Sequence, residues 1–253
     1  MKKFGKIIIF TGSKGGCGQS FIANCVANYL AIKTNYNILM IDMNTGSRDS
    51  RTLYHITNEE IVTPADICHV KKKPSIEDIK NLIVNFGNSL SYIFPPLQKQ
   101  DKTYSYMFIQ YLFRQLANIF DLIVVDCDML IDFNIKNGSI FDLSDELMIV
   151  SLADKISVSN LNLIISYFLK TKESLSMKVI INKYNIRPAV SIFRLNSLVR
   201  YPVSQFIPYD RDIENLYLTK GPSGIFKYNL KIVKDISQLA EGLTGVITDP
   251  DNI

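Results

Sequence analysis

Short apolar runs along the chain alternate with segments whose apolar residues recur at helical spacing. The first run, residues 6–10 (KIIIF), is rich in β-branched residues and ends in Thr-Gly, as expected of a strand covered on both faces. After a cluster of glycines, apolar residues at positions 22, 25, 26, 29 and 30 share one face of a helix. Further strands are predicted at 37–42, 91–94, 121–126, 146–151, 177–182 and 205–208, and further helices at 104–119 and 157–169.

This alternation of strands and amphipathic helices predicts an α/β fold with a mostly parallel twisted β-sheet and helices on both of its faces. With 253 residues, of which 47% are hydrophobic, the chain can bury a substantial core. No internal repeat, low-complexity tract or Gly/Ser-rich linker divides it. We therefore expect a single domain over residues 1–253.

The amino-acid composition gives only weak information about the cellular compartment of the protein and about the partners that it binds. The net charge of +4, from 28 Lys+Arg and 24 Asp+Glu, is too small to require nucleic acid or an acidic membrane as a partner, and it excludes neither. The four cysteines form no Cys-x-x-Cys pair, and only two histidines could help a metal site, which favours reduced thiols in a cytoplasmic protein. No apolar stretch approaches the ~20 residues that a membrane span requires.

The segment TGSKGGCGQS, residues 11–20, has the features of a phosphate-binding loop. Its glycines would let main-chain N–H groups converge on phosphate oxygens, and the helix that follows presents its positive N-terminal end to the same charge. Ser20 stands where a hydroxyl could bind Mg²⁺. Gln19 stands where such loops carry a lysine, and its neutral amide cannot offset the charge of a transferring phosphoryl group. We expect nucleotide binding without fast hydrolysis; the alternative is a Gly-rich turn that binds no ligand.

These residues resemble the deviant Walker A loop, K-G-G-x-G-K-[ST], of the MinD/ParA superfamily of SIMIBI-class P-loop ATPases. Residues 14–20 (KGGCGQS) match every specified position except that of Gln19. The resemblance implies ATP and Mg²⁺ as cofactors, and a face-to-face homodimer in which Lys14 reaches the nucleotide of the partner subunit. The alternative for Lys14 is a solvated surface side chain. By the same resemblance, the residues that bind the nucleotide are Gly15, Gly16, Cys17, Gly18, Gln19, Ser20 and Phe21.

The segment FDLIVVD, residues 120–126, resembles the Walker B strand of this superfamily. The resemblance places Asp126 where a carboxylate holds Mg²⁺ through water, together with the hydroxyl of Ser20. A carboxylate at the end of a strand that faces the loop could do this chemically. The alternative is an aspartate that only caps its strand.

The segment NILMIDMNTGSRDS, residues 37–50, resembles the second strand and first switch of the superfamily, which places Asp42 and Asn44 at catalytic positions. The second of these positions normally carries the carboxylate that orients the attacking water. The amide of Asn44 can hold water but cannot accept a proton. Asp49 is a nearby substitute if the register differs. Two altered positions, Gln19 and Asn44, together favour a degenerate enzyme.

Two later segments resemble the part of the superfamily that surrounds the adenine base. Residues 177–185 (MKVIINKYN) place Asn182 where the base is read, and FIPYDRD places Pro208 and Asp210 beside it. An asparagine after a strand is otherwise a common turn former.

Within the superfamily the chain is most similar to the CpaE/TadZ branch of Flp/Tad-type pilus assembly, because of the altered loop lysine, the switch near Asn44, SYIFPP and IPYDRDIENLYLTKG. The resemblance implies a nucleotide-dependent dimeric localisation or scaffold factor with weak or absent ATPase activity, and envelope or pilus secretion proteins as partners. Two alternatives stay open. One is an active ParA/MinD-type ATPase for DNA partition or for division-site or flagellar positioning, and the other is a pseudo-ATPase interaction protein without nucleotide.

The C-terminus and the surface charges bear on membrane and nucleic-acid binding. The ending GLTGVITDPDNI lacks the basic amphipathic helix of cell-division members, so we expect no direct membrane anchor, and recruitment to the inner face of the membrane would need a protein partner. Solvated charges are favoured over a nucleic-acid site for the basic residues, and nucleic acid is the less expected partner. The basic residues concerned are Lys71, Lys72, Lys73, Arg187, Arg194 and Arg200.

Overall fold

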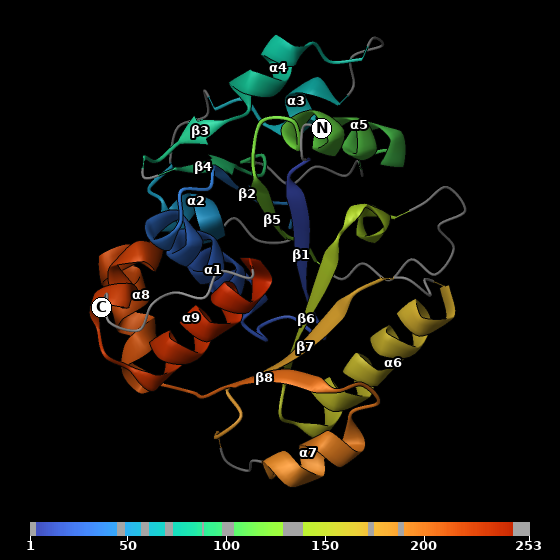
Figure 1. Ribbon diagram of the computed structural model, residues 1–253, viewed down its shortest axis with the longest axis vertical. Coiled ribbons are helices and arrows are strands. Elements are labelled where there is room, and N and C mark those ends of the chain that lie inside the picture. Colours follow the sequence, from blue (N-terminus) through green and yellow to red (C-terminus); the bar gives the residue numbers. More distant parts are fainter. Residues whose placement is uncertain are drawn as a thin grey trace. The chain divides into compact units, whose positions relative to one another are not determined.

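The computed structural model describes residues 4–44, 49–56, 61–68, 73–87, 89–97, 104–128, 139–171, 175–186 and 190–244 (Figure 1). Its strands are β1 (Lys6–Gly12), β2 (Ile38–Asp42), β3 (Val84–Asn85), β4 (Leu90–Ile93), β5 (Leu122–Asp126), β6 (Glu146–Leu152), β7 (Met177–Asn182) and β8 (Val203–Ile207). Its α-helices are α1 (Gln19–Lys33), α2 (Asp49–Leu53), α3 (Pro64–Ile67), α4 (Ile76–Asn81), α5 (Tyr106–Leu116), α6 (Lys155–Thr171), α7 (Ile192–Leu198), α8 (Arg211–Gly224) and α9 (Lys231–Thr244). Two short 3-10 helices, η1 (Ile140–Leu143) and η2 (Ile225–Lys227), complete the described elements.

The described strands form an eight-stranded sheet in the order β3-β4-β2-β5-β1-β6-β7-β8. The short β3 pairs antiparallel with β4, whereas β1 with β5, β2 with β4 and β5, and β7 with β8 are parallel. Parallel strands need long crossover connections, and the helices between them supply these. The predicted α/β fold with a mostly parallel sheet is therefore confirmed.

The chain forms two compact units, each discontinuous in sequence. The first comprises Met1–Thr11, Asn35–Met148 and Ser174–Met177, and the second comprises Gly12–Thr34, Ile149–Glu173 and Lys178–Ile253. The expectation of a single domain over residues 1–253 stays a prediction.

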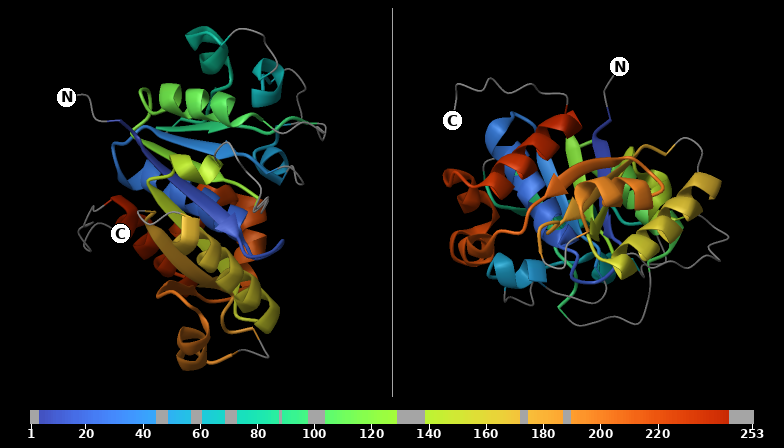
Figure 2. Two further views of the ribbon diagram at one scale, coloured as in Figure 1. Left: turned by 90° about the vertical axis from the view of Figure 1, so that its right-hand side faces the viewer. Right: turned by 90° about the horizontal axis from the view of Figure 1, so that it is seen from below.

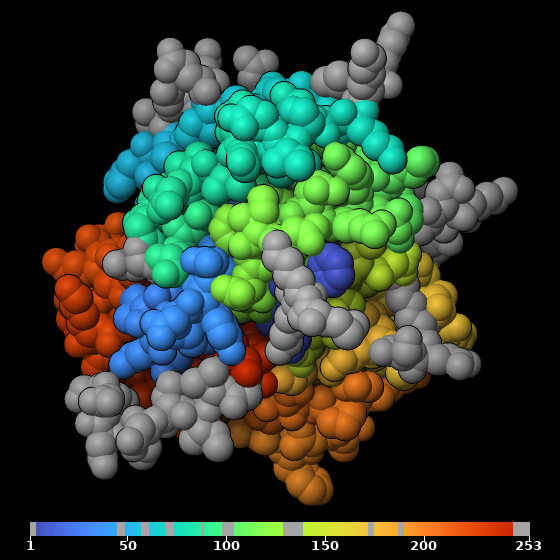
Figure 3. Space-filling view, turned by 45° about the horizontal axis from the view of Figure 1, so that its top comes forward, coloured from blue at the N-terminus to red at the C-terminus, as the bar shows by residue number. Residues whose placement is uncertain are grey.

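In the first unit, β5 lies between β1 and β2, and almost every residue of these strands is buried. The parallel register sets Asp126 opposite both Phe10 and Asp42, so the carboxyl ends of β2 and β5 meet at one edge. The helix α5 begins after Ser105, whose side chain accepts a hydrogen bond from the N–H of Phe108. It lies next to α4 on the surface of this unit (Figure 3).

In the second unit, α1 packs against α8 and α9, and both views of Figure 2 place these three helices together. The hydroxyl of Tyr29 in α1 donates a hydrogen bond to Glu241 in α9. The apolar positions predicted for one face of the first helix are buried as expected. The helix α8 is interrupted at Gly221, whose φ of 71° lies in the left-handed region just before Pro222, and both residues interrupt helical geometry.

No helix among the described residues is long and apolar enough to cross a membrane.

Candidate functional site

The loop between β1 and α1 is open on one side. β1 ends at Gly12, Gly18 stands at the N-cap and α1 begins at Gln19. Gly16 and Gly18 have φ of 76° and 89°, in the left-handed region that favours glycine. Gly15 and Gly16 are exposed, and a Cβ placed on either would meet no atom within 4 Å. The loop therefore leaves space beside the main chain at two glycines, as a phosphate-binding loop requires.

The same loop is closely packed where it leaves β1. A Cβ on Gly12 would lie 2.3 Å from Oε1 of Gln19 and 2.5 Å from Sγ of Cys17. Cys17 is buried, with 1% of its surface exposed. The side chains of Gln19 and Cys17 thus lie against the end of the strand. On its open side, at Gly15 and Gly16, this loop can offer main-chain N–H groups to a phosphate.

Ser20 and Phe21 occupy the first turn of α1. Both are half-buried, and the carbonyl of Ser20 accepts a hydrogen bond from Nδ2 of Asn24 at 2.8 Å. The ring of Phe21 meets that of Tyr217 in α8 edge-on, with centroids 4.8 Å apart. The hydroxyl of Ser20 is an oxygen donor of the kind Mg²⁺ prefers.

Asn182, at the end of β7, contacts the glycine loop between β1 and α1 through its side-chain amide. Its Nδ2 donates to the carbonyl of Cys17 at 2.9 Å, and its Oδ1 accepts from the N–H of Lys183 at 2.9 Å. Only 2% of its surface is exposed, and a Cβ on Gly18 would lie 2.3 Å from its Nδ2. Sequence reasoning assigned Asn182 to the adenine base. That assignment stays a prediction. In the structure, the amide of this residue contacts the carbonyl of Cys17 and holds the glycine loop in place.

Pro208 and Asp210 lie in the segment between β8 and α8. Pro208 is buried, and Asp210 caps α8 by accepting a hydrogen bond from the N–H of Asp212 at 2.9 Å. Asn185 and Tyr209 exchange hydrogen bonds, so the segments that follow β7 and β8 lie side by side. The structure thus brings the three residues predicted to surround a base into adjoining segments of the second unit.

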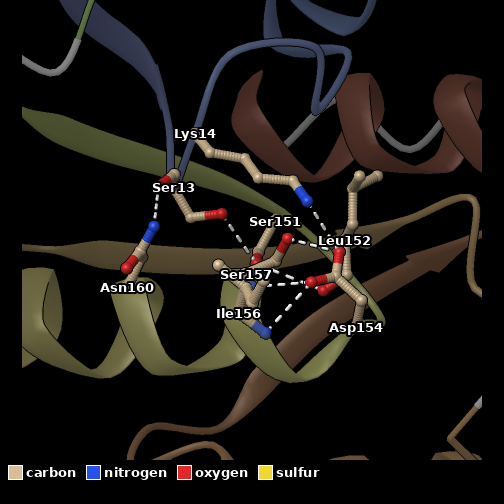
Figure 4. Close-up of polar contacts among 8 residues, drawn as sticks. All are labelled: Ser13, Lys14, Ser151, Leu152, Asp154, Ile156, Ser157 and Asn160. Carbon is tan, nitrogen blue, oxygen red and sulfur yellow. Dashed lines mark hydrogen bonds and ion pairs between the residues drawn. The ribbon is translucent and has the colours of Figure 1, made fainter.

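Lys14 forms an ion pair within its own chain (Figure 4). Its Nζ lies 2.9 Å from Oδ2 of Asp154, and both side chains are partly exposed. Asp154 also caps α6, because Oδ1 accepts from the N–H groups of Ile156 and Ser157, and Oδ2 accepts from the Ser157 hydroxyl at 2.6 Å. Burial acts to raise the pKa of Asp154, but the hydrogen bonds from Ser157 and Lys14 outweigh it and lower the pKa to about 2.

The residue before Lys14 ties the loop to the same part of the second unit. Ser13 donates through its N–H to the carbonyl of Val150 at 2.8 Å and through its hydroxyl to that of Ser151 at 2.9 Å. Nδ2 of Asn160 in α6 donates to the carbonyl of Ser13 at 3.3 Å (Figure 4). The loop is therefore anchored by β6 and α6 at its start and by Asn182 at its end.

In the first unit, Asn44 bridges two buried carboxylates. Its Nδ2 lies 2.9 Å from Oδ1 of Asp42 and 2.6 Å from Oδ2 of Asp126, and all three residues are buried. The main-chain N–H of Asn44 also donates to Asp42 at 2.9 Å, and the hydroxyl of Ser50 donates to the other Asp42 oxygen. An aspartate at position 44 could not make the two side-chain contacts to Asp42 and Asp126, because an ionised carboxylate has no hydrogen to donate. Asp49, the predicted substitute, is exposed at the start of α2.

Burial in this cluster raises the pKa of Asp42 to about 7, and the nearby charge of Asp126 adds to the effect. The hydrogen bonds from Ser50 and Asn44 act in the opposite direction but do not cancel it. Asp42 therefore holds a proton in the folded chain over a pH range in which an exposed aspartate is ionised.

Sequence reasoning missed the partners of the predicted residues. Asp154 carries an N-cap signal, since it stands between an apolar strand and a helical pattern with Ser157 three residues on. Nothing in the spacing pairs it with Lys14, 140 residues earlier. The sequence around Ser50 does not indicate that its hydroxyl contacts Asp42, because this contact depends on the positions of β2 and α2. The C-terminal segment 245–253 and the basic residues Lys71, Lys72 and Arg187 lie outside the described residues.

Comparison with known protein families identifies one that matches most of the chain. The profile of the CobQ/CobB/MinD/ParA nucleotide binding domain (CbiA) matches residues 8–222. No curated protein sequence matches the chain significantly.

Similar solved structures include a ParA family ATPase from Chlorobium tepidum, with TM-score 0.75 and 21% identity over 95% of this chain and 99% of that one. A putative plasmid partition protein from Borrelia burgdorferi bound to AMPPNP has TM-score 0.72 and 21% identity, over 96% and 100% of the two chains. The MinC:MinD cell division complex of Aquifex aeolicus gives TM-score 0.77 and 18% identity, over 96% and 97%. These likenesses support the fold.

The matched profile covers most of the chain, from within β1 to near the end of α8, and so includes the glycine loop and both carboxylate strands, β2 and β5. The predicted superfamily is confirmed at this level: the chain belongs to the CobQ/CobB/MinD/ParA nucleotide-binding domain family.

Proposed function

We propose that the chain binds ATP with Mg²⁺ through the glycine loop and hydrolyses it slowly or not at all. The observation that carries this proposal is the open main chain at Gly15 and Gly16, ahead of a helix N-terminus and braced from behind by Asn182. Main-chain N–H groups and a helix end attract phosphate without a side-chain cation. Oxygen donors from Ser20 and Asp126 suit Mg²⁺, which when bound would offset phosphate charge.

The proposed weakness of hydrolysis rests on two neutral amides. Gln19 cannot supply the positive charge that stabilises a transferring phosphoryl group. Asn44 cannot accept a proton from water, and its amide is already engaged with Asp42 and Asp126. The chain thus keeps groups that hold a nucleotide and lacks groups that speed its cleavage.

Replacing Gln19 by lysine tests this proposal. We expect Gln19→Lys to tighten ATP·Mg²⁺ binding by roughly tenfold, because a charge-assisted hydrogen bond is about twice as strong as a neutral one, and to raise a low basal turnover. Calorimetry and phosphate release measure the two effects. Gln110→Lys, which adds the same charge at an exposed position of α5, is the control and should change neither.

The outcome separates the alternatives. If the unaltered chain already turns over efficiently and Gln19→Lys adds little, it is an active ParA/MinD-type ATPase, and turnover measured with DNA or lipid would identify the stimulus. If neither form binds ATP at millimolar concentration and no nucleotide shifts the melting temperature, the chain is an interaction protein without nucleotide.

We further propose that the bound nucleotide supports a homodimer that serves as a localisation or scaffold factor, in an envelope assembly of the Flp/Tad pilus type. The resemblance to the CpaE/TadZ branch, the altered loop and Asn44 support this role. Lys14 would contact the nucleotide of the partner subunit, and to do so it must leave Asp154.

Replacing Asp154 by asparagine tests this step. Asparagine caps a helix as well as aspartate does, so α6 should be retained while the ion pair is lost. A partly exposed ion pair contributes about 0.2–1 kcal/mol, and in Asp154→Asn this energy no longer holds Lys14 away from the partner subunit. We therefore expect the association constant of the ATP-dependent dimer, measured by sedimentation, to rise by about two- to fivefold. Lys14→Gln should abolish that gain. A dimerisation constant equal to that of the unaltered chain would contradict the proposed role of Lys14.

A further inference from the structure

The charges of the chain are distributed unevenly along the sequence. Between Asp154 and Asp210 the sole acidic residue is Glu173, against eight lysines and arginines. The whole chain has a net charge of +4, so the remainder is slightly acidic. This stretch contains α6 and α7, and neither helix carries an acidic residue.

The two helices belong to the second unit and lie side by side. Nδ2 of Asn162 in α6 donates to the carbonyl of Leu198 at 2.8 Å, and its Oδ1 accepts from the N–H of Arg200 at 2.9 Å. The guanidinium of Arg200 also reaches the hydroxyl of Ser166, at 3.5 Å. Figures 1 and 2 likewise place α7 beside α6. We call the outer surface of these helices the α6–α7 face.

Large apolar side chains are exposed on this face. Phe193 of α7 is 88% exposed, and Ile156 and Leu163 of α6 are 68% and 61% exposed. Ile156 and Leu163 are two helical turns apart, and Lys170 follows at the same interval, so the three share one line along α6. The exposed large apolar residues of the two helices are Ile156, Leu163, Leu169, Ile192, Phe193 and Leu198.

Exposed cations accompany these side chains. Lys155 and Lys170 stand at the two ends of α6, Arg194 lies in α7, and Arg200 follows α7; all four are exposed. Asp154, the acid that precedes α6, is paired with Lys14. The α6–α7 face therefore combines positive charge with protruding apolar groups and has no acidic side chain of its own helices to oppose an anionic surface.

We propose that the α6–α7 face binds directly to an anionic lipid bilayer. Cations attract acidic headgroups, while apolar side chains enter the boundary of the acyl region, and the two contributions add. Nucleic acid would use the cations but would gain little from Phe193, Ile156 and Leu163, because its backbone offers phosphate. This surface contact differs from the expectation that membrane recruitment needs a protein partner, and it requires neither nucleotide nor a terminal helix.

Flotation with vesicles tests the proposal on the full chain without nucleotide. We expect the chain to float with phosphatidylcholine vesicles that contain phosphatidylglycerol, to float poorly with phosphatidylcholine alone, and to release as salt is raised. Phe193→Ala combined with Leu163→Ala should lower the bound fraction by at least about tenfold. Arg194→Gln with Lys170→Gln should lower it by a similar factor.

Matched controls distinguish binding through this face from non-specific adsorption of the protein to vesicles. Leu218→Ala removes an equally exposed apolar side chain from α8 of the same unit, and Lys80→Gln with Arg114→Gln removes two exposed cations of the first unit; both should float as the unaltered chain does. All replaced side chains are exposed, so melting temperatures should not change.

Three results would overturn the proposal: no flotation with anionic vesicles, flotation that the face variants leave intact, or binding to duplex DNA without binding to vesicles. Because the experiment omits nucleotide, each of these results leaves the proposed ATP binding untouched.

Discussion

Replacing Asp42 by asparagine is expected to make the protein more stable than the unaltered chain, by an amount that grows as the pH rises from about 4 to about 7. The folded chain raises the pKa of Asp42 from 3.8 to about 7, through burial and the nearby charge of Asp126. Between these values the folded state holds a proton that the unfolded state has released, so the unaltered chain loses stability with rising pH. A shift of about three pKa units corresponds to up to about 4 kcal/mol, lost in full above pH 7.

Chemical denaturation at several pH values, without nucleotide or Mg²⁺, measures this effect as the difference between the variant and the unaltered chain. Asparagine keeps an oxygen for the two donors of Asn44 and can donate to Ser50, so the contacts survive. Asp49→Asn, at an exposed carboxylate seven residues away, should give no such pH-dependent gain. A difference that stays constant across this pH range would show that folding does not raise the pKa of Asp42.

Replacing Gly18 by alanine should both destabilise the second unit and abolish tight nucleotide binding. The new Cβ would lie 2.3 Å from Nδ2 of Asn182, and alanine would have to adopt a φ of 89°. The left-handed backbone costs an L-residue roughly 1–2 kcal/mol, and displacing the buried amide adds to this, so we expect a loss of about 2–4 kcal/mol. ATP affinity should fall at least about tenfold, because the brace on Cys17 is lost.

Gly15→Ala is the informative comparison. A methyl group there meets no atom within 4 Å, so the free energy of unfolding should change by no more than about 0.5 kcal/mol. The methyl group would nevertheless project beside the open main chain and weaken ATP binding. Equal stability of the Gly18→Ala variant and the unaltered chain would mean that Asn182 does not brace the loop.

The strands were predictable because their signal is local. Buried parallel strands read as short apolar runs, and the predicted 177–182 coincides with β7. The predicted helix 104–119 is shorter in the structure, since α5 ends at Leu116 in a turn that leads into β5. Six helices, α2, α3, α4, α7, α8 and α9, were not predicted. Of these, α7 is short and buries little, and α8 carries the Gly221-Pro222 interruption.

The candidate residues of the site could be named from the sequence, and their binding roles stay predictions, but the contacts of their side chains could not be predicted. Glycine spacing and strand ends identify the loop and the carboxylates from neighbouring residues. The pairing of Lys14 with Asp154, the brace from Asn182 and the bridge by Asn44 join residues up to 165 positions apart. Such contacts depend on the order and register of strands, which no local pattern specifies.

The bridge made by Asn44 also constrains how this lineage could change. One amide satisfies two buried acids, and a mutation that placed aspartate there would remove both side-chain donors and add a third acidic group in the same place. We expect an aspartate at position 44 to be disfavoured unless a compensating cation were acquired first. An amide at position 44 should therefore be retained wherever the two buried acids are present.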